Sequence, residues 1–270
     1  MTRAVFVLQC ISMTYPKFLI PVMLIFPLFF AATLMPQAAH AAGDCAISAD
    51  DLSAIQTIQS NPNLSYLDEI KQELAARKLL LSKTITCAQD DAQSLKSEVD
   101  GLSVAAADKN LQSQLSGKID DAINYYNIEL GKLNGSGILG SELIAQEVLS
   151  WRANTYTQLS SNVDNFVLWS QNQNLFQTAS ARMAQITPMV SFLSQANNSD
   201  LETAFAAAQT SFNTAENENA SARNALLQFL SPDQTLGIIK QSLQSLSDTY
   251  NDFFNLSNVI QKLLPSTSQN

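Results

Sequence analysis

Histidine is nearly absent from this chain of 270 residues: the only one, His40, lies at the end of an apolar N-terminal segment. Without histidine, the rest of the chain has no Ser-His-Asp or Cys-His arrangement and no zinc site of the usual types. It also lacks the Glu-x-x-His pairs that hold two irons in a helical bundle. We therefore expect a protein that is not an enzyme and that uses no metal and no cofactor.

Glycine and proline are also scarce, with eight of each. So few breakers in a chain of this length predict long uninterrupted helices or strands. Gly135 and Gly137 are not followed by the Lys-Ser/Thr of a phosphate-binding loop, so we expect a turn there. Neighbouring acids such as Asp90 and Asp91 point about 100° apart on a helix, and we expect solvated surface rather than a catalytic carboxylate pair.

The N-terminus carries the one long apolar run, Phe18 to Met35, which follows Lys17. The sequence Ala39-His40-Ala41 fits the A-x-A rule for signal peptidase, so we expect residues 1–41 to be an export signal that is cleaved after Ala41. Met13 is an alternative start, because the stretch before Lys17 is long for a positively charged region. An uncleaved N-terminal anchor is the other interpretation, since the run approaches the length that spans a bilayer.

The predicted location is therefore outside the cytoplasm: the periplasm, the cell surface or the medium. After residue 41 the chain has 13 basic and 24 acidic residues, a net charge of −11. This acidic balance argues against nucleic acid and anionic membrane surfaces as partners. No later segment is apolar for long enough to cross a membrane. We expect a protein partner or self-association.

Two cysteines, Cys45 and Cys87, remain after the predicted cleavage. An even number of cysteines in an exported chain predicts a disulfide. A helix over residues 48–60, a turn at 61–64 and a helix from residue 65 fold back so that the two cysteines can meet. A loop of this size stabilises the fold by about 4 kcal/mol in the chain-entropy model.

Apolar residues recur at alternating spacings of four and three along the chain, the pattern of coiled-coil packing. We expect helices over about 48–60, 65–102, up to 133, 141–196, 201–229 and 236–264. The last two form an antiparallel hairpin. The fold is thus predicted to be all-α: an elongated antiparallel bundle of about five to six helices over residues 42–270, with a subdivision near 134–140 left open.

The expected seams are specific enough to be tested. The third helix is expected to bury Ile119, Ala122, Tyr126, Leu130 and Leu133. The last helix is expected to bury a stripe that contains Leu236, Ile239, Leu243, Leu246, Tyr250, Phe253 and Ser257. Asn219 occupies a seam position of the preceding helix, where it either pairs with another buried polar group or lies at a solvated edge.

The candidate contact residues are aromatic and amide side chains on the helix expected over 141–196. Trp151, Tyr156 and Trp169 are placed to line a pocket between helices, and Asn172 lies in an amide-rich stretch. Aromatic residues at helical spacing more often form core. The leading hypothesis is a non-catalytic exported bundle that acts as an interaction or structural module. The alternatives are a small-ligand sensor or carrier and a soluble form of a helical pore-forming toxin.

Overall fold

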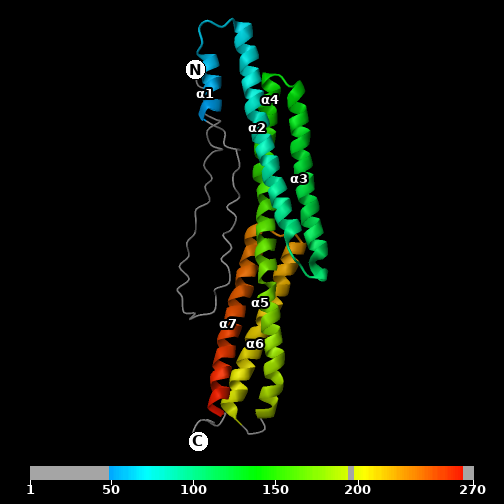
Figure 1. Ribbon diagram of the computed structural model, residues 1–270, viewed down its shortest axis with the longest axis vertical. Coiled ribbons are helices and arrows are strands. Elements are labelled where there is room, and N and C mark those ends of the chain that lie inside the picture. Colours follow the sequence, from blue (N-terminus) through cyan, green and yellow to red (C-terminus); the bar gives the residue numbers. More distant parts are fainter. Residues whose placement is uncertain (1–48, 194–197, 264–270) are drawn as a thin grey trace. The chain divides into compact units, whose positions relative to one another are not determined.

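The prediction of an all-α helical bundle is confirmed by the computed structural model (Figure 1), which describes residues 49–193 and 198–263. No strand occurs within these described ranges. All of them belong to one compact unit, residues 42–270. The predicted export signal, with its alternative start at Met13, lies outside the described residues, and so does Cys45.

The first helices follow the expected boundaries. Helix α1 (Ala49–Gln59) ends at the predicted turn, and α2 (Tyr66–Gly101) begins where the Ser65 hydroxyl accepts a hydrogen bond from the Asp68 amide. This contact satisfies one of the free amides of the first turn. From Leu81 onward, the apolar positions expected to form the seam of α2 are buried up to Val99: Leu81, Ile85, Ala88, Ala92, Leu95 and Val99. At the start of the helix the expected position Leu67 is exposed.

The connection from α2 to α3 (Lys109–Gly135) runs through the short helix η2 (Ala106–Asp108). The side-chain amide of the buried Gln112 donates hydrogen bonds to the carbonyls of Val99 and Leu102 at 2.7 and 3.0 Å. These bonds cap the C-terminal end of α2. In α3 the seam departs from expectation, because Glu129 is buried and Leu130 is only half-buried.

The helix expected over 141–196 is two α-helices joined by a π-helix. Helix α4 (Ile138–Trp151) leads into η3 (Arg152–Tyr156) and then α5 (Thr157–Leu193). The Thr157 amide bonds to the carbonyl of Arg152, five residues back, which is the π spacing. Pro188 lies inside α5, close to its C-terminal end at Leu193.

Helices α6 (Ser199–Leu227) and α7 (Pro232–Leu263) pack along each other and form the predicted hairpin. The seam of α7 is shifted by one residue at every second position. Its apolar positions Ile239, Leu246 and Phe253 are as expected, but Thr235, Ser242, Thr249 and Leu256 are buried in place of Leu236, Leu243, Tyr250 and Ser257.

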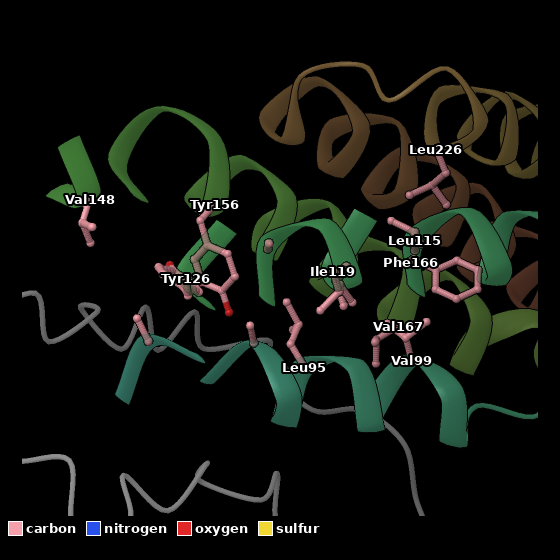
Figure 2. Close-up of a cluster of buried hydrophobic side chains, with 14 of the residues drawn as sticks. Leu95, Val99, Leu115, Ile119, Tyr126, Val148, Tyr156, Phe166, Val167 and Leu226 are labelled. Carbon is pink, nitrogen blue, oxygen red and sulfur yellow. The ribbon is translucent and has the colours of Figure 1, made fainter. Parts of the chain in front are cut away.

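Two hydrophobic clusters form the core, and α5 contributes to both of them. The second cluster joins the C-terminal half of α5 to α6 and α7. The first cluster joins α2, α3 and α4 to the start of α5 and to the α6–α7 turn region, so it spans both sides of residues 134–140. Figure 2 shows part of it, with Leu95, Val99, Leu115, Ile119, Tyr126, Val148, Tyr156, Phe166, Val167 and Leu226 labelled.

Candidate functional site

The structure divides the four candidate contact residues between two places. Trp151 and Tyr156 lie at the two ends of the π-helix η3 and belong to one aromatic group. Trp169 and Asn172 lie further along α5, and at the rise of an α-helix Trp169 is about 20 Å from Tyr156 along the axis. A single pocket lined by Trp151, Tyr156 and Trp169 is therefore not formed.

Around η3, four aromatic rings contact one another. Trp151 stacks on Tyr125 with ring centroids 4.0 Å apart and an interplanar angle of 18°. Tyr126 meets Trp151 edge to face at 5.3 Å and Tyr156 at 5.9 Å. Figure 2 shows Tyr126 and Tyr156 side by side, from α3 and η3 respectively. Such contacts stabilise a fold by about 0.5–1.5 kcal/mol per pair beyond burial.

Arg152, the first residue of η3, connects this group to α2. Its guanidinium lies 5.0 Å from the Tyr156 ring centroid and donates to Asp91 Oδ2 at 2.9 Å and to the Tyr126 hydroxyl at 3.5 Å. Burial alone lowers the pKa of Arg152, but its interactions with Tyr126 and Asp91 outweigh burial and raise the pKa. Arg152 therefore stays charged, and its charge is paired with that of Asp91.

The tyrosine hydroxyls in this group resist ionisation. Burial, together with the negative charge of Glu129, raises the pKa of Tyr125 to about 12. Burial also raises the pKa of Tyr126 and of Tyr156, and Asp91 adds to both shifts. All three phenols are therefore neutral at physiological pH.

Beside the stacked pair lies an open hollow of about 650 Å³ between α3 and α4. Glu129 is one of its lining residues, although it is only 2% exposed. Lys132 donates to Glu129 Oε1 at 2.7 Å, whereas Glu129 Oε2 is buried without a hydrogen-bond partner among the described residues. The other lining residues are Tyr125, Lys132, Gln146, Glu147, Ser150, Trp151, Asn154 and Thr155.

Trp169 belongs to the core of the bundle. It is 3% exposed, and its indole N–H donates to Asn219 Oδ1 at 2.8 Å. Asn219 also exchanges hydrogen bonds with Gln173, at 3.0 and 3.2 Å. Of the two interpretations of Asn219, pairing with buried polar groups is the one that the structure supports. Asn172 is half-buried and donates to the Leu168 carbonyl of its own helix.

Other expectations concern residues that the structure covers only in part. Cys87 is half-buried on α2, and its predicted partner lies outside the described residues, so the Cys45–Cys87 bridge stays a prediction. Over 49–193 and 198–263, no set of three His, Cys, Asp or Glu side chains converges as a metal site would require. None of the helices described is both long and apolar enough to cross a bilayer.

Glu129 is the residue that the expected seams missed. Ile119, Ala122, Tyr126, Glu129 and Leu133 alternate by three and four without a slip, so the pattern itself places a carboxylate in the seam. Leu130 was expected in the seam because it is apolar, although Glu129 fits the spacing better. A charged residue at a position that the spacing places in the seam was the available signal for a buried carboxylate.

Comparison with protein-family models, with curated proteins and with solved structures found no match.

Proposed function

We propose that this protein is an exported, non-catalytic helical bundle that acts as an interaction module outside the cytoplasm. The observation that supports this proposal is the outward face of α4. Leu139 and Leu143 are 76% and 59% exposed, although the opposite face of the same helix supplies the buried residues Ile144 and Val148. Two adjacent leucines in water contribute nothing to the core of the bundle.

The exposed leucines lie on one continuous stripe. Leu139, Leu143, Gln146 and Ser150 follow each other at spacings of four, three and four, so they share one face of α4. Gln146 and Ser150 also line the hollow beside Trp151. The stripe therefore connects an apolar pair to a polar hollow, which is a suitable surface for a partner helix.

Other large apolar side chains are exposed as well, and some of them also lie in pairs. Tyr66 and Leu67 lie at the start of α2, Phe192 near the end of α5, and Phe254 on α7. Single exposed apolar residues are common on monomeric proteins, whereas adjacent ones indicate an interaction surface. We place the partner on α4 because its two exposed leucines continue into the stripe of Gln146 and Ser150.

Export and the disulfide belong to the same proposal. The signal at 1–41 and the cysteine pair both predict an oxidising compartment. N-terminal sequencing of the protein from its native cells tests this part: a chain that begins at Ala42 supports cleavage, and a retained N-terminus supports the anchor instead.

Site-specific photo-crosslinking in the native cells tests the interaction. A photoreactive residue at Leu143 is expected to give a discrete cross-linked species, either with a second protein or with another copy of this chain. The matched control carries the photoreactive residue at Gln241, an exposed position on α7. Monomer alone at both positions contradicts the proposal.

A second candidate function, a small-ligand sensor or carrier, is favoured by one observation, the hollow of about 650 Å³ that Tyr125 and Trp151 line.

A further inference from the structure

Acidic side chains border the exposed face of α4 on both sides. The α4 stripe is the row Leu139, Leu143, Gln146 and Ser150. At 3.6 residues per turn, Glu142 lies beside this row on one side and Glu147 on the other, each within about 90° of its midline. Both glutamates are exposed. The apolar pair of the stripe is therefore flanked by negative charge.

The basic side chains near α4 leave most of this charge uncompensated. Lys132 donates to Glu129 at 2.7 Å and lies 3.9 Å from Glu147, whose side chain remains 60% exposed. Arg152, which follows the last residue of α4, is paired with an acid of α2. Helix α4 itself contains no basic residue. A partner that packs on the α4 stripe therefore meets two carboxylates.

The spacing of Glu142 and Glu147 decides between two kinds of partner. In a parallel pair of helices, a residue that flanks the seam faces the flanking residue five positions further along the other helix. Glu142 and Glu147 are five residues apart, so two parallel α4 helices bring glutamate against glutamate on both sides. In an antiparallel pair each flank faces its own counterpart, with the same result. A second copy of α4 is therefore repelled in either direction.

A helix with basic flanks fits the same surface. Its apolar row covers Leu139 and Leu143, and its flanking lysines or arginines face Glu142 and Glu147. Leu149, which is 52% exposed, lies seven residues after Glu142 and widens the apolar surface on that side. The 14 residues of α4 give a contact of about two heptads.

We propose that the α4 stripe binds an amphipathic helix of a different protein, in which lysine or arginine flanks the apolar row. This inference rests on the proposed function, because it names the partner of the same surface. It also excludes the pairing of two α4 helices from two copies of this chain. Apolar contact supplies the attraction, and the flanking charges select the partner.

Two designed peptides of about three heptads test the proposal. Both carry leucine at the two core positions of each heptad, and the flanking positions are lysine in one peptide and glutamate in the other. Fluorescence anisotropy follows the binding of each labelled peptide to the protein purified from its native cells. We expect the lysine peptide to bind at least about tenfold more tightly at about 50 mM salt, and this preference to shrink at about 500 mM. Equal binding of the two peptides, or no binding of the lysine peptide, overturns the proposal.

Charge reversal assigns the preference to α4. In Glu142→Lys with Glu147→Lys, the glutamate peptide is expected to bind more tightly than the lysine peptide. The matched control is Asp121→Lys with Glu216→Lys, which changes the net charge equally at exposed positions of α3 and α6. This control is expected to keep the native preference. A control that loses the lysine peptide as fully as the α4 variant shows attraction to net charge alone, and the proposal fails.

Glu142→Gln with Glu147→Gln keeps the test decisive if the new lysines disturb the pair of Lys132 and Glu129. Glutamine has nearly the shape of glutamate and carries no charge, so the fold is expected to be unchanged. The two peptides are then expected to bind with affinities within about threefold of each other. A preference that remains at about tenfold contradicts the role of these two glutamates.

The cross-link from Leu143 in the native cells separates this inference from the proposed function. Support for both is a cross-linked species that contains a different protein and is lost in Glu142→Lys with Glu147→Lys. A species with the mass of two copies of this chain, or a cross-link that survives the charge reversal, overturns this inference and leaves the interaction module standing. The absence of any cross-link in the native chain contradicts the proposed function, and this inference with it.

Discussion

The hairpin of α6 and α7 and the region around η3 are built from different side chains. Along α6 the buried residues are mostly alanines with a few large side chains, and α7 offers an alternation of large apolar and small hydroxyl residues. Ser242 and Thr249 donate to carbonyls of their own helix. Around η3, by contrast, four aromatic rings, an arginine and a glutamate are partly or fully buried together.

This difference indicates that the side chains of the α6–α7 hairpin serve mainly to pack its helices together. Small residues opposite large ones let two helices approach closely, and hydroxyls that bond within their own helix require nothing from a neighbour. The polar layer of Asn219, Gln173 and Trp169 is also complete in itself. The η3 region leaves Glu129 Oε2 without a donor among the residues described, and the hairpin leaves the buried Thr235 Oγ1 without a partner. The two regions therefore differ in the kinds of side chain that they bury, and not in whether every polar atom is paired.

The largest expected effect comes from the hairpin. Leu246→Ala removes a buried side chain from the α7 seam and is expected to lower the free energy of unfolding by about 2–5 kcal/mol. Urea denaturation followed by circular dichroism measures the change. Leu143→Ala is the control, because that leucine is exposed and its loss is expected to change stability by less than about 0.5 kcal/mol. Equal losses at both positions are incompatible with a seam that dominates stability.

A smaller effect is expected from the polar layer inside the hairpin. Asn219→Ala removes the acceptor of the Trp169 indole N–H and the partner of Gln173, at a cost of about 1–3 kcal/mol. The emission of Trp169 is expected to shift as its hydrogen bond is lost, and Trp151→Phe in the same background isolates that signal. A variant as stable as the native chain means that water replaces the asparagine without cost.

The sequence predicted the fold well because packing imposes a strict period. The seam of α2 and the hairpin of α6 and α7 follow from spacing alone, and Ser65 marks the start of α2 by its capping chemistry. The π-helix was missed because residues 152–156 contain neither proline nor glycine, and one extra residue in a turn leaves no compositional mark. The α7 seam was shifted because hydrophobicity favoured Leu243 over Ser242, whereas close packing favours the smaller side chain.

The candidate site was less predictable. Trp151 and Tyr156 contact each other, whereas Trp169, which was grouped with them, lies several helical turns further along α5. Glu129 and Tyr125 come from another helix, and no rule of spacing within 141–196 brings them to Trp151. Contacts between helices depend on which faces pair, and a single sequence does not specify that pairing.

The smallest expected effect concerns alkaline pH. Tyrosine in the unfolded chain ionises near pH 10, whereas the folded pKa of Tyr125 is about 12 and those of Tyr126 and Tyr156 are raised by burial. Above about pH 10 the unfolded chain therefore loses protons first, and the free energy of unfolding falls as the pH rises. Below that pH these tyrosines contribute no pH dependence.

The η3 region and the hairpin differ in the number of tyrosines whose pKa is raised. The double substitution Tyr126→Phe with Tyr156→Phe is expected to flatten this fall more than Tyr250→Phe, which removes one tyrosine with a raised pKa from the hairpin region. Unfolding in urea at about pH 8 and about pH 11 measures the slope. A larger effect from Tyr250→Phe shows that the hairpin, rather than the η3 region, carries the alkaline sensitivity.

The most direct test of the division between packing and contact is the double variant Leu139→Ser with Leu143→Ser, with the photoreactive residue moved to Gln146 on the same stripe. The account predicts a free energy of unfolding within about 0.5 kcal/mol of the native chain, together with loss of the cross-link that the native stripe gives from Gln146. A variant that unfolds more easily but still forms the cross-link contradicts it, because the leucines then serve the fold and not a partner.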